Sequence, residues 1–461
     1  MSLILVDYLE PLESSTSREM EKEGITMNKS MEKLERYLNK YLLPIANKIN
    51  ENKVITAIKD GMMFAIPVIL FASVGLIITN FPFLNEFAPD VSNFLNSVLG
   101  FISNSTMSLL SIFVIIGTAT SYSQAKGIDP LYGLLAAFGA YFMVTPTTIF
   151  KDLMVNDEIV NGVEVPNVIS ADYLGSSGIF AAVAITIIAI AIYAKLFHKN
   201  ITIKMPDSVP PNVTKPFLSI LPFSLMLVVF IIIRNLMTLT PYGSLPEAIS
   251  EILTKPLLGL GNNIWAFLFL IFIAQLLWFF GIHGSNITIN AVWLPVATVA
   301  MVKNIEAFNA GKALPYALTA AFLGYVTQSK LSPIVALMVI GKSERSKSIG
   351  KLSIVPAMFN IHEPFIFGLP LVLNTTLFIP FVLIEVFQTG LAYFLMNLTG
   401  AIAIFQVPWT IPPIITQLIA TNFNPWSVVI ALVTLFVGVI LWVPFIKILD
   451  NQFLREEASE K

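Results

Sequence analysis

The stretch GMMFAIPVILFASVGLIITNF, residues 61–81, holds no charged side chain. It is long enough to cross a membrane, because about 20 helical residues span ~30 Å of hydrocarbon. Of the whole chain, 56% is hydrophobic and only 12% charged, which is more apolar surface than one soluble core can bury. We expect an all-α polytopic membrane protein with about ten transmembrane helices. Further apolar stretches lie near 102–122, 131–150, 177–197, 217–240, 263–282, 287–302, 313–340, 352–373, 376–397, 401–421 and 426–448.

Two of these stretches do not fit a plain span. The stretch 287–302 is short, and 352–373 is interrupted by polar residues, Pro364 and Gly368. Irregular backbone at membrane depth is stable only inside protein or beside a water-filled cavity. We therefore predict two re-entrant hairpins, near 287–302 and 352–373, that line a substrate site.

Pro and Gly residues crowd 241–262, which predicts a boundary between two membrane halves. The half 61–240 has few ionisable groups, whereas 241–461 holds both interrupted stretches. We expect the chemistry to belong to residues 241–461.

Residues 1–60 are expected to form an N-terminal extension and an amphipathic interfacial helix. Residues 1–26 lack the basic region of a signal peptide, and Met27 is a candidate native start. The apolar spacing from Met27 to Ile49, with lysines between, predicts a helix on the membrane surface, bent at Pro44. The alternative is a solvated helix that only precedes the first span.

Lys and Arg in the short loops predict the orientation. The basic segment before the first span, the stretch 195–216 and the C-terminal tail are expected in the cytoplasm, and the loops 82–101 and 151–176 outside. Both termini are then cytoplasmic. Lys and Arg in 342–351 favour the cytoplasm as well, but two hairpins would put that loop outside, so its side stays open.

Composition excludes several classes of function. The chain has no Cys, so disulfides, thiolate metal sites and Cys nucleophiles are absent from it. The three His are too far apart in sequence for a local metal cluster, and we expect no metal and no cofactor. A net charge of -2 gives no support to nucleic-acid binding.

Glu363 is the strongest site candidate. It lies in NIHEPFIFG, residues 360–368, where a carboxylate costs several kcal/mol unless it is paired, hydrated or protonated. Pro364 lacks an N–H and favours extended backbone at Glu363, as at a hairpin tip. Asn360 and His362 beside it are substrate-binding candidates. The alternative is a structural carboxylate paired with Arg234, Lys330 or His283.

Two further groups contain candidate sugar-binding residues. His283 lies between two Gly in FFGIHGSN, residues 279–286, which frees the backbone to expose His283 and Asn286. Trp409 lies in the Pro-broken VPWTIPPI, residues 407–414, and offers a flat face to a sugar ring. The alternatives are a helix-end cap for His283 and an interfacial anchor for Trp409. Lys330 and Gln328, in an otherwise apolar segment, are weaker candidates.

Several of these pieces resemble the membrane permease (IIC component) of the bacterial phosphoenolpyruvate:sugar phosphotransferase system, in its lactose/cellobiose branch. They are MEKLERYLNKYLLPIANKI at 31–49, IKDGMMFAIPVIL at 58–70, MPDSVPPNV at 205–213, FFGIHGSN at 279–286, GKLSIVPAMFNIHEPFIFGLPLVLN at 350–374, VPWTIPPI at 407–414 and PFIKILDNQ at 444–452.

This resemblance implies a function. A homodimer, joined through the first five helices, imports a disaccharide across the bacterial cytoplasmic membrane and binds it in the second half. The chain would be the membrane subunit of a sugar phosphotransferase complex, because the phosphoryl group comes from a phosphocysteine on the IIB protein. His283 and Glu363 match sugar-binding positions, with Glu363 as general base. His362 stands where many relatives carry Asn, and GYVTQSKLSP at 324–333 departs from the usual Gly-rich form.

Three points stay open at the level of sequence. The sugar is of cellobiose, diacetylchitobiose or lactose type, and the phosphorylated hydroxyl is not fixed. An ion-coupled sugar symporter would also need buried carboxylates, for which Glu363, Glu385 and Asp60 are available. A non-transporting membrane scaffold would explain the spans but not the interrupted segment at Glu363.

Overall fold

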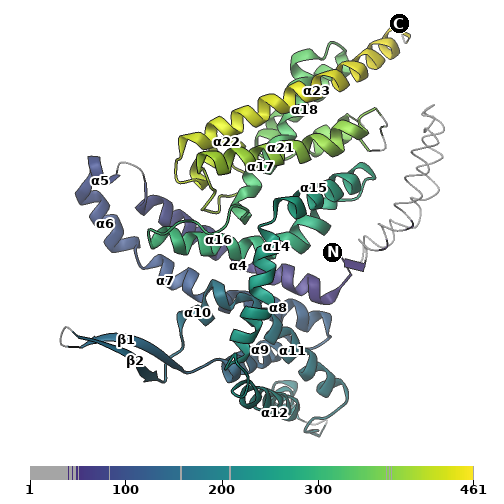
Figure 1. Ribbon diagram of the computed structural model, residues 1–461. Helices are drawn as coiled ribbons and strands as arrows, with labels where there is room; N and C mark the ends of the chain where they lie inside the picture. The colour runs from purple at the N-terminus through teal and green to yellow at the C-terminus, as the bar shows by residue number, and fades with distance from the viewer. Residues whose placement is uncertain are drawn as a thin grey trace.

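The computed structural model describes residues 40, 44, 48, 49, 51–81, 84–155, 158–206, 209–369, 371–372, 374 and 376–459. The predicted extension 1–26, and nearly all of the amphipathic helix expected over 27–49, lie outside these residues. The described chain is mainly helical, with its helices stacked in one elongated body (Figure 1).

Eight helical runs among the described residues are long and apolar enough to cross a membrane, or nine if one bent pair is counted. Many of their large apolar side chains point outward, as at Phe269 and Phe436, which are 62% and 65% exposed. Apolar side chains that point outward suit contact with lipid, which confirms the predicted class of helical membrane protein. The number of about ten spans stays a prediction. The runs are Lys53–Thr79, Pro89–Ala125, Ser176–His198, Val213–Met237, Asn286–Asn309, Ala320–Ile340, Phe378–Thr399 and Pro425–Ser459.

The N-terminal elements pack around small residues. Gly117 allows helices α4 and α8 to touch, because a Cβ there would lie 2.9 Å from the Gly61 Cα. A core of alanines and tyrosines joins α8, α9 and α11. The elements are α4 (Lys53–Thr79), α5 (Leu84–Phe87), α6 (Pro89–Leu99), α7 (Ile102–Thr106), η2 (Met107–Leu109), α8 (Leu110–Ala125), α9 (Pro130–Val144), α10 (Ala171–Leu174), η3 (Ser176–Gly178), α11 (Ile179–His198) and α12 (Pro211–Met237).

A β-hairpin interrupts this helical part. Strands β1 (Thr148–Val155) and β2 (Glu158–Pro166) pair antiparallel and project away from the helices (Figure 1). An external loop over 151–176 was expected here, in an all-α protein. Its β-branched residues favour strands, and pairing satisfies the backbone hydrogen bonds without a buried core.

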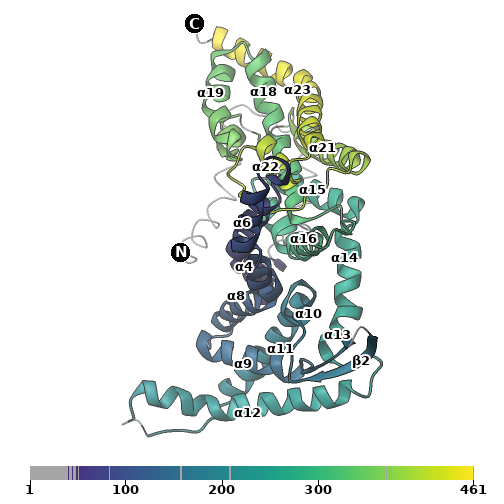
Figure 2. The same cartoon turned by 90° about the vertical axis from the view of Figure 1, so that its left-hand side faces the viewer.

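The predicted boundary 241–262 is a helical connection. It consists of α13 (Leu245–Ile249), the π-helix η4 (Ser250–Thr254) and α14 (Lys255–Gly261), and it bends by 70° into α15 (Ile264–Phe279). Figure 2 shows it running from α12 up to α15. Pro246 lies in the first turn of α13, where a missing N–H breaks no hydrogen bond.

The C-terminal elements complete the body. They are the π-helix η5 (Asn286–Trp293), α16 (Leu294–Asn309), η6 (Ala320–Phe322), α17 (Leu323–Thr327), η7 (Gln328–Lys330), α18 (Leu331–Ile340), α19 (Glu344–Met358), α20 (Glu363–Gly368), α21 (Phe378–Thr399), α22 (Pro413–Ala420) and α23 (Pro425–Ser459).

The two stretches expected as hairpins differ from one another. The stretch 287–302 does not turn, because η5 and α16 form one helical run from Asn286 to Asn309. A re-entrant hairpin near 287–302 would therefore need its turn outside this run, and it stays a prediction. The stretch 352–373 is broken between Met358 and Glu363, and Asn360 there has a φ of 61°.

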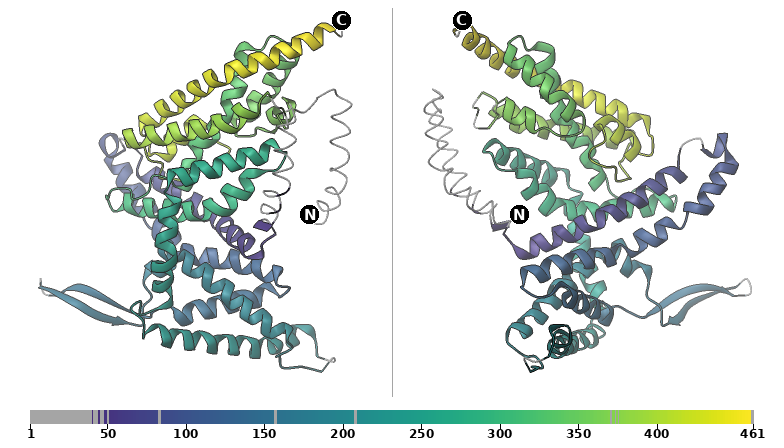
Figure 3. Two further views of the ribbon diagram at one scale, coloured as in Figure 1. Left: turned by 45° about the vertical axis from the view of Figure 1, so that its right-hand side comes forward. Right: turned by 180° about the vertical axis from the view of Figure 1, so that it is seen from behind.

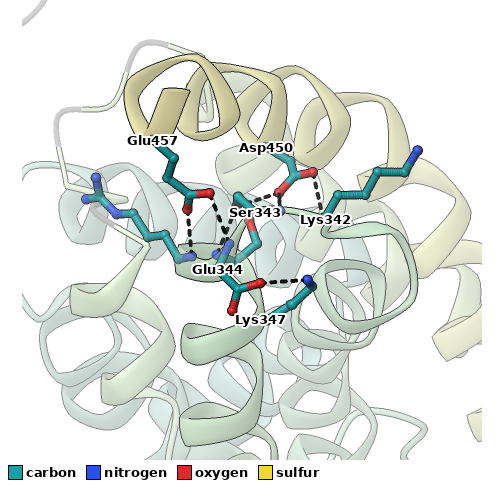
Figure 4. Close-up of polar contacts among 8 residues, drawn as sticks. Lys342, Ser343, Glu344, Lys347, Asp450 and Glu457 are labelled. Carbon is teal, nitrogen blue, oxygen red and sulfur yellow. Dashed lines mark hydrogen bonds and ion pairs between the residues drawn. The ribbon is translucent and has the colours of Figure 1, made fainter. Parts of the chain in front are cut away.

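Residues 341–347, called here the 341–347 turn, comprise the connection between α18 and α19 and the first turn of α19, and they are fixed to the end of α23 (Figure 4). Asp450 accepts hydrogen bonds from the backbone N–H groups of Lys342 (2.8 Å) and Ser343 (3.0 Å) and from the Ser343 hydroxyl (2.7 Å). Glu457 accepts from the backbone of Arg345 at 3.0 Å. The 341–347 turn therefore lies at the same end of the molecule as the C-terminus, opposite the β-hairpin (Figure 3).

Candidate functional site

A pocket lies within the C-terminal elements, between α15, η7, α18, α20, α21 and α23. Its wall combines aromatic and aliphatic side chains with a small set of polar ones, as expected of a small-molecule site. The lining residues are Gln275, Trp278, Ser329, Lys330, Pro333, His362, Phe365, Ile366, Phe381, Glu385, Gln388 and Trp442.

Several polar groups of the pocket wall lack a hydrogen-bond or ion-pair partner. The Nε2 atoms of Gln275 and His362 and the Oε1 atom of Gln388 make no hydrogen bond, although these residues are 1%, 7% and 2% exposed. Glu385 is 9% exposed, and within the described part of the chain neither it nor Lys330 forms an ion pair. Each such group costs about 1–3 kcal/mol if it stays unsatisfied. Hydroxyl groups both donate and accept, so a polyhydroxylated ligand would satisfy all of them.

His283 contacts Trp278, which lines the pocket, and it therefore lies beside the pocket. The rings of His283 and Trp278 are 4.3 Å apart between centroids, and the Trp278 indole N–H donates to the Ser285 hydroxyl at 3.3 Å. The chain folds back onto α15 at Gly284, where a Cβ would lie 2.1 Å from the Ala274 carbonyl oxygen. The glycines noted in the sequence thus bring an exposed imidazole to a pocket wall.

The break after α19 brings two predicted groups together. Asn360 uses its Nδ2 to donate to the Trp409 and Ile411 carbonyl oxygens, the latter at 3.3 Å, which ties the break to residues 409–411. His362 points into the pocket, whereas the neighbouring Glu363 is exposed at the start of α20. Arg234 does not pair with Glu363, which was one structural alternative. It donates instead to the Met143 carbonyl oxygen at 2.7 Å.

The remaining predicted residues lie off the pocket wall. Trp409 is 63% exposed, and Asn286 accepts a hydrogen bond from Asn290 at 2.9 Å. Their roles stay predictions, as do those of His283, Asn360, His362 and Glu363.

Sequence reasoning missed most of the pocket wall. Gln275, Trp278, Gln388 and Trp442 were not singled out, because amides and aromatics in apolar helices are common packing residues. A signal did exist for the charged residues. Lys330 lies at the midpoint of the run Ala320–Ile340, and Glu385 lies inside α21, and ionisable residues within spans are usually functional.

Comparisons with known proteins show the family of this chain. Residues 59–384 match the family model "Phosphotransferase system, EIIC". The chain is 32% identical to the oligo-beta-mannoside-specific EIIC component of Bacillus subtilis (strain 168), over 92% of this chain and 96% of that protein. It is 30% identical to the cellobiose-specific EIIC component of Geobacillus stearothermophilus, over 93% and 97%.

A solved structure is also similar. The crystal structure of the transporter ChbC, the IIC component from the N,N'-diacetylchitobiose-specific phosphotransferase system, matches with a TM-score of 0.83 and 31% identity, covering 92% of this chain and 99% of that one. These comparisons support sugar transport by the phosphotransferase system and not the ion-coupled symporter. This multi-pass membrane protein belongs to the phosphotransferase-system EIIC family, the sugar-permease family that its sequence resembles.

Proposed function

We propose that this chain imports a disaccharide of cellobiose, lactose or diacetylchitobiose type and presents it to a phosphorylated IIB protein. The observation that carries the proposal is the pocket of buried, unpartnered donors and acceptors beside the break at 359–362. The cellobiose-specific relative and the N,N'-diacetylchitobiose-specific transporter reported above support the substrate class.

Glu363 is the proposed general base. Its exposed carboxylate accepts the proton of the sugar hydroxyl while the hydroxyl oxygen attacks phosphorus. The phosphorus–sulfur bond of the phosphocysteine breaks, and the thiolate remains on IIB. None of the 461 residues is Cys, so the phosphoryl carrier is not in this sequence. The charged product cannot return through an apolar path, which makes import one-way.

The other predicted residues have binding or positioning roles in this proposal. His362, on the pocket wall, and His283, beside Trp278, hydrogen-bond sugar hydroxyls. Asn286 supplies a further amide near His283. Asn360 fixes the backbone that carries Trp409, whose exposed ring stacks on a sugar.

The proposed orientation places both termini in the cytoplasm of a bacterial cell. The 341–347 turn, whose exposed Lys342, Arg345 and Lys347 favour the cytoplasm, shares an end with the C-terminal turns of α23. The connection from α11 to α12 lies on the same side in Figures 1 and 3. The homodimer, formed through the half 61–240, rests on the family resemblance.

Reconstitution tests the proposal. Purified protein in lipid vesicles should bind and slowly exchange a disaccharide but accumulate none as sugar phosphate. Adding phosphorylated IIB should produce one-way trapping of sugar phosphate, and ionophores that collapse ion gradients should leave it intact. Gradient-driven accumulation without IIB would overturn the proposal in favour of a symporter.

A further inference from the structure

We infer that Gln417, in α22, is a positioning residue for the phosphoryl transfer. It holds α22 in place, and α22 in turn holds the break at 359–362, from which Glu363 reaches the sugar hydroxyl. The inference rests on the proposed function. It adds a residue outside the site described above, since Gln417 is not among the described residues that line the pocket.

Gln417 joins α22 to α17 and η7. Its side chain is 1% exposed, and its Nε2 donates to the Gly324 carbonyl oxygen at 2.6 Å and to the Gln328 Oε1 at 2.9 Å. Side-chain amides connect helices in this way within a membrane, where lipid offers no competing hydrogen-bond partner. Helix α22 has only 8 residues, so these two hydrogen bonds restrain both its position and its rotation.

The residues just before α22 hold the break. Asn360 donates from its Nδ2 to the carbonyl oxygens of Trp409 and Ile411, the latter at 3.3 Å. The hydroxyl of Thr416, in α22, donates to the same Ile411 carbonyl oxygen at 2.9 Å. Because α22 and the break share this acceptor, a shift of α22 moves Asn360, and Asn360 lies three residues before Glu363.

The same chain of hydrogen bonds reaches the pocket wall. Gln328 donates from its Nε2 to the Thr434 hydroxyl, and the Thr434 carbonyl oxygen accepts from the Gln388 Nε2 at 2.8 Å. Gln388 lines the pocket. The break and the pocket wall are therefore two ends of one polar chain that passes through α22. The position of the proposed base relative to the sugar thus depends on Gln417, which lies between these two ends.

Loss of this tie should slow the transfer more than it weakens sugar binding. The proposed sugar contacts come from several elements, whereas the break alone carries the proposed base. A displacement of about 1 Å can lower a rate about 100-fold when it misaligns the reacting groups. Met has nearly the size of Gln but cannot donate a hydrogen bond. We expect Gln417→Met to lower the phosphorylation rate at saturating sugar and IIB at least about tenfold, and the affinity for sugar less than about threefold.

Two measurements on the purified full chain test the inference. Calorimetry gives the affinity for whichever of cellobiose, lactose and N,N'-diacetylchitobiose binds most tightly, and rapid quenching gives the rate of sugar phosphate formation with phosphorylated IIB. The matched control is Thr421→Val. Thr421 directly follows α22 and is 5% exposed, and its hydroxyl donates to the carbonyl oxygens of Gln417 and Leu418, one turn back along the same helix. The control should match wild type in both measurements.

The Asn360→Gly variant tests the other end of the tie. Gly adopts the φ of 61° at this position without strain, and the variant loses both Nδ2 hydrogen bonds. It should show the same difference between rate and affinity as Gln417→Met. Since the two residues act through one tie, the double variant Gln417→Met/Asn360→Gly should be no slower than the slower single variant.

The outcomes separate the inference from the proposed function. An Asn360→Gly variant with the wild-type rate would overturn the inference, even if Gln417→Met did not fold. Equal losses of rate and affinity in Gln417→Met, as for a merely structural residue, would overturn it too, and so would rate losses that multiply in the double variant. A wild-type protein that forms no sugar phosphate with phosphorylated IIB would instead overturn the proposed function.

Discussion

Glu363 and His362 are neighbours in sequence but have opposite surroundings. His362 is 7% exposed and lines the pocket, whereas Glu363 is exposed at the first position of α20. The change of direction at Asn360 produces this difference, because a φ of 61° turns the chain between α19 and α20. A polar residue inside an apolar stretch was enough to find this segment. Which side chain would be buried depended on the packing of α20 and was not visible in sequence.

Replacing Glu363 with Gln should abolish phosphorylating uptake without unfolding the protein. The side chain is exposed and makes no described ion pair, so stability should change by less than about 0.5 kcal/mol. The amide cannot accept the hydroxyl proton. Uptake into vesicles loaded with phosphorylated IIB measures the effect, and undiminished uptake would exclude Glu363 as the base.

Replacing His283 with Ala should weaken disaccharide binding by about 1–3 kcal/mol, the usual loss for a removed hydrogen-bond partner. The neighbouring Trp278 ring stays in the pocket wall, so the pocket itself should persist. Calorimetry on the purified variant gives the affinity. An unchanged affinity would return His283 to the role of a helix-end residue.

The sequence predicted the long apolar helices well. It predicted poorly those elements that depend on local backbone pairing. Long apolar stretches became helices, such as α4 and α21, because hydrocarbon requires internal backbone hydrogen bonds. The β-hairpin over 148–166 was missed, because its strands bury no common core and leave no apolar run. The wide turns of η5 were not foreseeable either, since no residue in 286–293 marks a π-helix.

Replacing Asp450 with Ala should destabilise the contact between α23 and the 341–347 turn. Three donors of Lys342 and Ser343 would lose a buried acceptor, and we expect a cost of about 2–4 kcal/mol. The measurable results are a lower Tm and faster tryptic cleavage in the turn.

Glu456→Ala is the control for this experiment. Glu456 is exposed and contacts Arg345 at 3.6 Å, and such surface pairs contribute little. An Asp450→Ala variant as stable and as protease-resistant as Glu456→Ala would show that these hydrogen bonds do not hold the turn.

At the scale of the molecule, the structure places the 342–351 loop beside the C-terminal turns of α23, so the loop and the C-terminus share one end of the molecule. The 342–351 loop was assigned to either side, depending on how many hairpins the C-terminal half contained. Its contacts with Asp450 and Glu457 place it at the C-terminal end of α23. Long-range contacts of this kind have no signature in a single sequence, whereas the membrane class followed from composition alone.

Labelling with a membrane-impermeant maleimide tests the orientation, and the Cys-free chain gives a clean background. The Ser348→Cys variant should react only in inside-out vesicles, and the Glu164→Cys variant, in the β-hairpin, only in right-side-out vesicles. Both positions are exposed. Reaction of both variants from the same side would contradict the proposed topology.

The fixed 341–347 turn has a mechanical consequence. Helix α19, with 15 residues and a length of about 22 Å, is held at its start by α23 and ends at the break that positions His362 and Glu363. Helix α23 also contributes Trp442 to the pocket, and α18 packs along it. Helices α18, α19 and α23 are thus joined to one another and to the pocket, and we expect them to move as one rigid unit. Under the proposed function, a displacement that carries the sugar through the membrane would carry Glu363 with it, so the proposed base and its hydroxyl would move together.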